Sequence, residues 1–466
     1  MKTRTLVLVG WVVVGLAVLT VVLMNGGKVT QAQRGSDNRV VLANGITVLM
    51  YPVPGAEKVA LVYFHPVGFL HEPKGMIQAA HLLEHLACQG ATKSYQAGEA
   101  MRLLNQEGMA NAETLSDFTY FDHVLPPGQL EPALQIAAER LSSLRIVPEI
   151  IRQEAPKCHQ EADIVERNPS AGMLKHAFMA FGQAWRHGAR EVQVREGLER
   201  IPVADLERFY RASYNPQGVV VVLAGAFERA KALELVEKHL GSIKPTGAAA
   251  PQPLPWSQVP EEMTVQWDSS VRAVCIGFPP PDDVKERFLL NLWGNLLFQR
   301  LMTDTHIQAA ADAMYCTNST WGVGTLPFFV YATAKANVSA EQLQRLLAAR
   351  VRSITAAKPG LTEMMQFRAM ASQFAHPPEF NEGFIRQQGQ ALASQLGRNP
   401  DEAAAMVMGN MAIQAGLREL LLGTDSAQVA KALQAVTADD LHRLLRRTLD
   451  PSRGFVTVLM PMGQAR

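Results

Sequence analysis

The feature that most constrains the fold is an internal repeat whose two copies are offset by 235 residues. The first copy begins at Ile201 and ends with a Tyr-Asn-Pro triplet at Pro216, and the second begins at Val436 and ends with a Leu-Asp-Pro triplet at Pro451. In both copies a capped helical pattern leads to a turn at the proline and then to a run of β-branched residues. The same unit closing each half of the chain predicts two related domains, each containing helices and strands.

A segment rich in proline and alanine lies between Pro245 and Pro260 and predicts where the two domains join. Neither a helix nor a sheet would retain so many prolines. We therefore predict an N-terminal domain at residues 38–244, a linker at 245–262 and a C-terminal domain at 263–466. A chain of 466 residues is also longer than one ordinary hydrophobic core requires, which agrees with this division.

Hydrophobic periodicity predicts the elements of the first domain. A hairpin turning at Asn44 and Gly45 opens it. Further strands are expected at 58–65 and 218–223, and helices at 78–88, 97–106, 131–144, 150–166 and 203–213.

The first 32 residues have a different character from the rest. Lys2 and Arg4 precede an uncharged, mostly apolar run from Thr5 to Met24, which is long enough to span a bilayer. We favour an uncleaved transmembrane anchor, with a signal peptide cleaved near Ala32 as the alternative. Both interpretations place the folded domains in the cell envelope, either anchored to the membrane or exported to a periplasmic space.

The charge balance excludes one class of partner. Forty-four Lys and Arg against 43 Asp and Glu give a formal charge of +1. No global electrostatic field would attract the chain to nucleic acid, so we expect no nucleic-acid binding.

A five-residue motif indicates the chemistry. His81 and His85 lie one turn apart on a predicted helix, so that both imidazoles can reach one metal ion. Neutral imidazoles suit zinc, and Glu84, on the same side, can accept a proton from a zinc-bound water without being a ligand itself. This arrangement is typical of peptide-bond hydrolysis.

A catalytic zinc ion normally takes a third protein ligand from another element. Glu161 can meet that need, because it lies on the predicted helix 150–166, seven residues after Glu154 and on the same face. Glu154 could then orient a ligand from behind. A solvated helix face is the alternative interpretation of both carboxylates.

These residues resemble the pitrilysin, insulinase and mitochondrial processing peptidase family of inverted-motif zinc peptidases. That family places its third ligand about 76 residues beyond the second histidine, where Glu161 stands, with another glutamate seven residues earlier, where Glu154 stands. The resemblance covers nearly everything from Asn38 onward. It also includes the hairpin, Glu72-Pro73, Asn111-Ala112-Glu113-Thr114, Phe118-Thr119-Tyr120, and Phe209 to Tyr214-Asn215-Pro216.

The resemblance implies two homologous α/β-sandwich domains of the LuxS and processing-peptidase type. It implies one zinc ion per chain bound by His81, His85 and Glu161, with Glu84 as the general base. Asn111 and Ala112 would belong to an edge strand that pairs with the substrate. The expected substrates are peptides or unfolded polypeptides, and the expected assemblies are a homodimer or a heterodimer with a homologous subunit.

The second half departs from the family pattern. It contains no zinc motif, and the helix expected to correspond to the zinc helix, at 288–302, has no histidine. Tyr315 is a counterpart of the family's substrate-binding tyrosine, with packing at a domain face as the alternative. His306 occupies the place of the family's arginine. A catalytically weak or inactive partner or scaffold subunit is therefore the second hypothesis for function.

Two of the four cysteines accompany the zinc motif. Cys88 shares a helical face with the two histidines, and Cys158 shares one with Glu154 and Glu161. Both thiols are expected to point toward the metal. They can pack as small apolar residues, form a disulfide, or be oxidation-sensitive neighbours of zinc.

Overall fold

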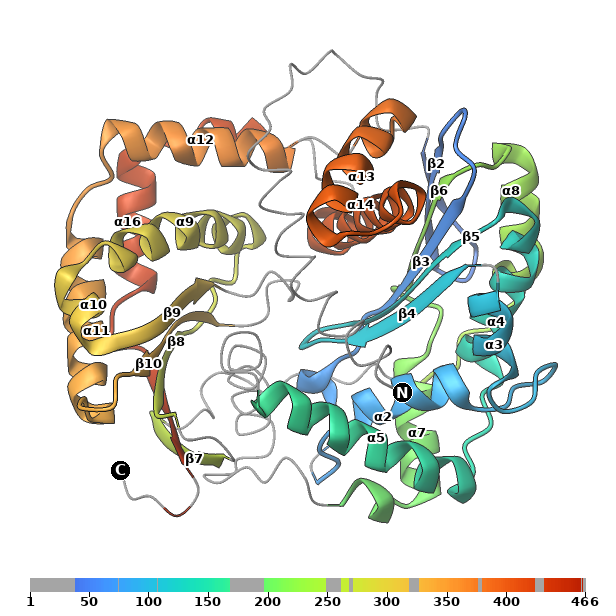
Figure 1. Ribbon diagram of the computed structural model, residues 1–466, viewed down its shortest axis with the longest axis horizontal. Coiled ribbons are helices and arrows are strands. Elements are labelled where there is room, and N and C mark those ends of the chain that lie inside the picture. The colour runs from blue at the N-terminus through green and yellow to red at the C-terminus, as the bar shows by residue number, and fades with distance from the viewer. Residues whose placement is uncertain are drawn as a thin grey trace.

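The structure is a computed structural model, and it describes residues 38–73, 75–106, 108–167, 197–248, 261–267, 271–317, 327–375, 379–423, 431–461 and 463. Two mixed β-sheets, each covered by helices, form the two halves of the chain (Figure 1). Most of the predicted linker, from residue 249 to 260, lies outside the described residues. The domain boundaries drawn from the sequence therefore stay a prediction.

The first half contains a six-stranded sheet in the order β1-β2-β6-β3-β5-β4. Neighbouring strands are antiparallel except β2 and β6, which run parallel. Its elements are β1 (Arg39–Val41), β2 (Thr47–Pro52), β3 (Val59–His65), η1 (Phe69–His71), α2 (Ala79–Gln89), α3 (Glu99–Gln106), β4 (Met109–Thr114), β5 (Thr119–Leu125), η2 (Pro127–Gln129), α4 (Leu130–Ser142), α5 (Pro148–Arg167), η3 (Leu198–Arg200), α7 (Val203–Ser213), β6 (Val220–Gly225), α8 (Arg229–Val236) and η4 (Glu237–Gly241).

The second half contains a five-stranded sheet in the order β7-β11-β8-β10-β9. Here β7 and β11 are the parallel pair. Its elements are β7 (Glu262–Trp267), β8 (Ala273–Phe278), α9 (Val284–Met302), α10 (Thr305–Ala310), β9 (Ala311–Thr317), β10 (Phe328–Ala334), α11 (Ala340–Ala356), α12 (Leu361–Ala375), α13 (Glu382–Leu396), α14 (Pro400–Leu422), α16 (Ala438–Thr448) and β11 (Phe455–Pro461).

The internal repeat predicted from the sequence reappears in the two sheets. Helices α7 and α16 begin at Val203 and Ala438, and strands β6 and β11 begin at Val220 and Phe455. Strand β6 pairs in parallel with β2 and antiparallel with β3, and strand β11 pairs in the same way with β7 and β8. The prediction of a mixed helix-and-sheet fold is confirmed.

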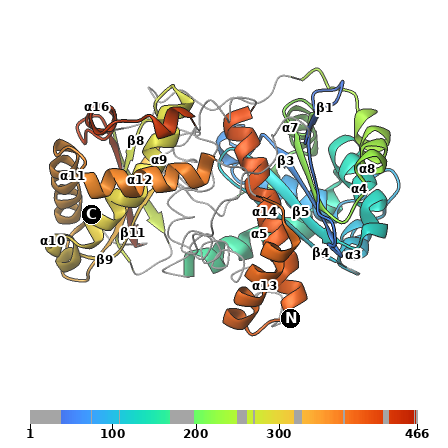
Figure 2. The same ribbon diagram turned by 90° about the horizontal axis from the view of Figure 1, so that it is seen from above.

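Helices cover both faces of the first sheet. The sequence did not predict that helices from the second half of the chain would cover one of them. Helices α3, α4 and α8 lie on one face, whereas α13 and α14 from the second half lie on the other (Figures 1 and 2). Helix α14 contacts β3, β5 and β6. All seven side chains of β3 are buried, because this strand faces apolar side chains on both sides.

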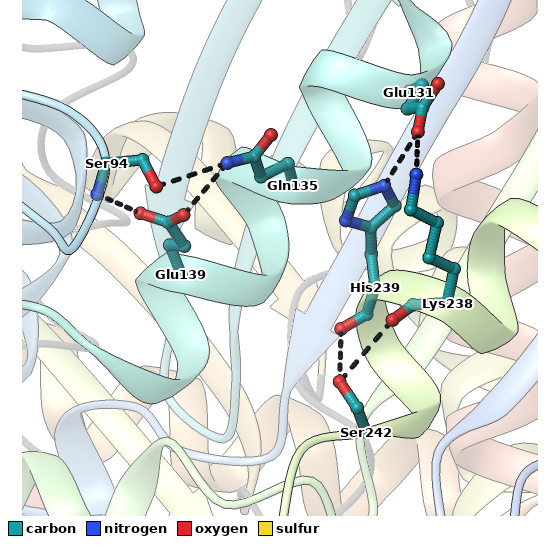
Figure 3. A network of polar contacts seen from close by, with 7 residues as sticks. All are labelled: Ser94, Glu131, Gln135, Glu139, Lys238, His239 and Ser242. Carbon is teal, nitrogen blue, oxygen red and sulfur yellow. Dashed lines mark hydrogen bonds and ion pairs between the residues drawn. The ribbon is translucent and has the colours of Figure 1, made fainter.

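Two polar clusters attach α4 to its surroundings (Figure 3). The carboxylate of Glu139 accepts hydrogen bonds from the backbone N–H of Ser94 at 2.8 Å and from Gln135 at 3.1 Å. About two turns earlier on α4, the carboxylate of Glu131 accepts a hydrogen bond from Lys238 Nζ at 2.6 Å, and His239 Nε2 lies 3.3 Å from the same oxygen. These contacts join α4 to the loop after α2 and to η4, and so stabilise the helical layer behind α2.

The predicted membrane-anchored location is corrected here. No helix among the residues that the structure describes is long and apolar enough to cross a membrane. Even α14, with 23 residues, includes Asp401, Glu402, Arg418 and Glu419, and charged side chains are costly in lipid. Residues 1–32, on which the anchor or signal peptide was predicted, lie outside the described residues. We therefore withdraw the membrane-anchored location.

Candidate metal centre

The two histidines of the motif lie on α2 beside each other. Their ring centroids are 4.8 Å apart and the rings are nearly perpendicular. Both residues are half-buried, while the neighbouring Leu82 and Leu83 are fully buried in the core. The amphipathic pattern of the helix thus directs the leucines inward and leaves one pair of imidazoles facing α5.

The start of α2 is stabilised by the carboxylate of Glu72, whose structural role the sequence did not reveal. Glu72 is fully buried, and its two oxygens accept hydrogen bonds from the backbone N–H groups of Gln78 and Ala80, each at 3.0 Å. A carboxylate at the N-terminus of a helix satisfies free N–H groups and opposes the helix dipole. Gln78 has a φ of 63°, an uncommon value for a residue other than glycine. Glu72 therefore positions the helix that presents the histidines.

Glu161 of α5 completes a three-residue cluster. Its Oε2 atom lies 3.4 Å from Nε2 of His81 and 3.5 Å from Nε2 of His85. Two ligands of one tetrahedral zinc ion, each about 2.0–2.2 Å from the metal, lie roughly 3.3–3.6 Å apart. Glu161 thus lies from each imidazole at the distance expected between two ligands of a single ion.

The electrostatics of the cluster favour a positive charge between these groups. Burial alone would raise the pKa of Glu161, but hydrogen bonds and charge interactions with His81 and His85 lower it well below its usual range. Burial would likewise lower the pKa of His85, yet its hydrogen bonds with Cys158, Glu154 and Glu161 raise that pKa far above its usual value. A site that stabilises a cation in this way suits a divalent metal.

Glu154 lies behind His85, as its position seven residues before Glu161 predicted. Its Oε2 atom is 3.2 Å from Nδ1 of His85, and the residue is only 2% exposed. Lys157 donates to the other carboxylate oxygen at 2.5 Å. Because Nδ1 is bonded to Glu154, the Nε2 atom of His85 is left to face Glu161, which is the orientation a metal ligand needs.

Glu84 of α2 makes a hydrogen bond to the first sheet. The hydroxyl of Thr114 donates to Glu84 Oε2 at 2.7 Å, and Glu84 is largely buried. Thr114 is the last residue of β4, so this hydrogen bond joins α2 to the end of the edge strand. No sequence signal pointed to Thr114 individually, because the contact depends on how the helix packs on the sheet.

Asn111 and Ala112 lie on β4, at the edge of the first sheet. They are opposite Asp122 and Phe121 of β5. Within the described residues, no strand pairs with the outer side of β4. The edge-strand position predicted for these residues is therefore where the structure places them, and their role in substrate binding stays a prediction.

Tyr315 and His306 lie in the second half of the chain, on β9 and α10. Tyr315 of β9 has its ring 6.4 Å from those of Phe298 and Tyr331, both in the same half. His306 is the second residue of the short helix α10, and 68% of its side chain is exposed. The predicted substrate contact of Tyr315 stays a prediction.

The cysteines are free, so the structure contains no disulfide between Cys88 and Cys158. Cys158 is fully buried, and its sulfur with one nitrogen of His81 and one of His85 forms a group of atoms that all lie within 4.8 Å of one another. Burial is the main factor that raises the pKa of both thiols, to about 11 for Cys88. Neutral thiols pack well, whereas the carboxylate of Glu161 is the stronger candidate for the third ligand.

Comparisons with known proteins identify relatives of both halves. Residues 48–189 match the model of the insulinase family, peptidase family M16, and residues 200–364 match that of the M16 inactive domain. The zinc protease PqqE of Helicobacter pylori is 25% identical over 251 residues, 53% of this chain and 56% of that protein. The mitochondrial-processing peptidase subunit beta of Blastocladiella emersonii is 25% identical over 202 residues, 43% of either chain. The matches thus span about half the length of these curated relatives.

Solved structures show the same fold over more of the chain. A protease from Helicobacter pylori aligns with a TM-score of 0.65 at 20% identity, covering 91% of this chain and 99% of that one. The first half of the periplasmic protease PqqL from Escherichia coli aligns with a TM-score of 0.57 at 16% identity, covering 92% and 93%. A peptidase M16 inactive domain from Pseudomonas fluorescens aligns with a TM-score of 0.64 at 14% identity, covering 92% and 98%.

Proposed function

The chain belongs to the insulinase family of peptidases, family M16, and on that premise we propose that it is a zinc-dependent endopeptidase. The observation that carries the proposal is the position of Glu161, whose carboxylate lies 3.4 and 3.5 Å from the two imidazoles of the motif. His81, His85 and Glu161 would hold one zinc ion and leave its fourth position open, as in catalytic zinc sites. The substrates we propose are peptides or unfolded polypeptides.

The surrounding residues have distinct tasks in this mechanism. A bound zinc ion would act as a Lewis acid that polarises the scissile carbonyl and lowers the pKa of a water molecule. Glu84 accepts the proton of the attacking water and returns it to the leaving amine. Thr114 donates to one oxygen of Glu84, which leaves the other oxygen for the proton transfer. Glu154 keeps the ring of His85 in place through Nδ1.

We propose that the peptide substrate binds along the edge strand β4. The open side of β4 has backbone N–H and C=O groups with which an extended peptide can pair, adding a seventh strand to the sheet. Asn111 and Ala112 would take part in this pairing. Since Thr114 at the end of the same strand contacts Glu84, strand addition brings the peptide backbone to the proposed general base.

A catalytically inactive partner subunit is the second candidate. It is favoured by the match of residues 200–364 to the M16 inactive domain and by the exposed His306 at the place of the family's arginine. Some relatives are also subunits, such as the mitochondrial-processing peptidase beta chain. The presence of Glu84 favours the enzyme, because hydrolysis at a zinc site needs a carboxylate beside the metal that is not itself a ligand. A homodimer or heterodimer is compatible with either function.

Two measurements on the purified protein test the proposal: zinc content, and cleavage of an unstructured peptide library. We expect about one zinc per chain. Glu84→Gln should keep the zinc and lower the cleavage rate by at least about 100-fold, because a general base contributes roughly 10²–10⁴-fold. His81→Ala should lose both.

Glu149→Gln provides the matched control on an exposed carboxylate of α5, and it should retain both zinc and cleavage. Cleavage by Glu84→Gln at the wild-type rate would refute the assignment of the general base. Wild-type protein that binds zinc but cleaves nothing in the library would favour the partner-subunit function.

A further inference from the structure

A buried arginine lies in the core of the first half, and within the described residues it hydrogen-bonds to no carboxylate. Arg140 of α4 is fully buried, and a guanidinium stays charged in proteins. It donates to the hydroxyl of Tyr63 at 2.7 Å and to the sulfur of Met101 at 3.0 Å, and its Nη1 atom lies 3.2 Å from Nε2 of His123. Burial raises the pKa of Tyr63 to about 12 and lowers that of His123 well below its usual value, so these partners are neutral.

Two histidines in the same core have ring nitrogens without partners. Because a guanidinium can only donate, Nε2 of His123 accepts from Arg140 and the proton of that ring is on Nδ1. Nδ1 of His123 is buried and has no partner among the described residues, and the same holds for both ring nitrogens of His65. Burial, and then the charge of Arg140, lowers the pKa of His65 to about 3. Both rings are therefore neutral, and each has an N–H group that no described residue accepts.

A small cavity of about 10 Å³ lies beside His65. This volume is about that of one water molecule, so the cavity has room for a single small ligand. Tyr63 and His65 are its polar lining residues, and the others are apolar: Ala137, Leu141, Val219, Val221 and Leu240. Arg140 lies one turn after Ala137 on the same side of α4, and its guanidinium contacts the hydroxyl of Tyr63. The positive charge of Arg140 is therefore near the cavity.

Unsatisfied donors are concentrated in this part of the core, in a group that we call the Arg140 cluster: Tyr63, His65, His123, Arg140 and Tyr214. The ring of Tyr214 stacks on that of His65, with the ring centroids 4.3 Å apart. The hydroxyl of Tyr214 and Nε of Arg140 are buried without a partner among the described residues. Both groups can donate, as can the unpaired N–H groups of the two histidines, whereas no member of the cluster is an anion. The cluster thus combines one positive charge with a surplus of donors.

An anion would compensate this cluster better than a water molecule would. Water can accept from a buried N–H group, but it leaves the charge of Arg140 without a counter-charge. Burying an uncompensated charge is far more costly than burying an unpaired polar group. The ring of Phe121, whose centroid is 5.1 Å from the guanidinium carbon of Arg140, offsets only part of that cost. A monovalent anion would accept from the unsatisfied donors and also make the cluster neutral.

We propose that the Arg140 cluster binds one small monovalent anion, such as chloride, in the cavity beside His65. The anion accepts from His65 and from the hydroxyl of Tyr63, whose oxygen already accepts from Arg140. It holds α4 to β3 and β5, the strands to which Tyr63, His65 and His123 belong, and so stabilises the helical layer behind α2. Anion binding here requires neither zinc nor peptide cleavage, so it is independent of the proposed peptidase function.

The test compares the unfolding of the full chain by urea in sodium chloride and in sodium gluconate at the same ionic strength. Gluconate is the reference because it is too large for the cavity. We expect chloride to raise the folding equilibrium constant, by about 100-fold when its concentration is 100 times its dissociation constant. Equal stability of the wild-type protein in the two salts would overturn the proposal.

Two variants locate the effect. Arg140→Met keeps a long apolar side chain without the charge, and His65→Phe keeps an aromatic ring without the nitrogens. Both should lose the chloride dependence, whereas Arg208→Met, at an exposed arginine of α7, should retain it. A chloride dependence that persists in Arg140→Met and His65→Phe would place the ion elsewhere and contradict the proposal.

Diffraction provides a second measurement, which does not depend on whether the variants fold. Crystals of the wild-type protein in sodium bromide should show an anomalous peak in the cavity beside His65, because bromide is a heavier halide of the same charge. A water molecule in the cavity with no anomalous signal, or bromide only on the surface of the protein, would show that the cluster does not bind a halide.

Discussion

The hydrogen bond between His85 and Glu154 allows a sharp test of the proposed metal centre, because Glu154 would affect a bound zinc ion without contacting it. Glu154 is 2% exposed, and its Oε2 atom lies 3.2 Å from His85 Nδ1. A buried carboxylate in this position fixes the ring orientation and increases the basicity of the opposite nitrogen. Glu154→Gln retains an acceptor oxygen but loses the charge, whereas Glu154→Ala removes both.

The expected loss follows from that difference. Removal of such a partner typically weakens metal affinity by about 10- to 100-fold, which corresponds to roughly 1.4–2.7 kcal/mol. We expect Glu154→Gln near the lower limit and Glu154→Ala near the upper one. The dissociation constant would be measured by competition with a chromophoric zinc chelator, with circular dichroism to verify folding.

A neighbouring carboxylate on the same helix serves as the control. Glu149 is exposed and pairs only with the exposed Arg152 in the described residues, so Glu149→Gln should change the zinc affinity by less than about twofold. If Glu154→Ala were to bind zinc as tightly as the wild type, the orientation of His85 by Glu154 would not matter. The geometry derived for the metal cluster would then be wrong.

Two further predictions concern the stability of the first sheet. A Cβ atom on Gly416 of α14 would lie 2.1 Å from the ring of Phe64, so Gly416→Ala should lower the free energy of unfolding by about 1–3 kcal/mol in urea denaturation. Gly128→Ala is the control, because a Cβ atom there would have no atom within 4 Å. If Gly416→Ala left the free energy of unfolding unchanged, α14 would not dock on the sheet as described. Burial, then the charge of Glu113, raises the pKa of Asp122 from 3.8 to about 7. The folded state therefore binds this proton more tightly than the unfolded chain, and the group makes the unfolding free energy fall between about pH 4 and pH 7, by up to ~4 kcal/mol. Asp122→Asn should remove that part of the pH dependence, and parallel pH curves for both proteins would contradict it.

Local patterns in the sequence were sufficient for the elements around the metal centre. The predicted helices at 78–88 and 150–166 appear as α2 and α5, shifted by one or two residues at their ends. The repeat at an offset of 235 residues predicted that α16 is the counterpart of α7 and β11 the counterpart of β6, because both copies contain similar helical periodicity and turn residues. The spacing of His81, His85 and Glu161 likewise anticipated which side chains meet.

Contacts between distant segments could not be anticipated in the same way. An apolar helix such as α14 shows in its sequence that it will be buried, but not which surface will bury it. Its docking on β3, β5 and β6 creates a second core, and with it a cavity beside Asp122. The hydrogen bond from Thr114 to Glu84 is of the same kind, since it depends on the crossing of α2 over the edge strand.

The edge strand makes the register of a bound peptide decisive for cleavage. A strand has a side-chain period of two, so a shift of the bound peptide by one residue would turn every side chain to the opposite face of the sheet. The same shift would change the bond that lies at Glu84, which hydrogen-bonds to Thr114 at the end of β4. On this argument the proposed metal cluster determines the reaction, and the pairing of the peptide with the edge strand determines where it occurs.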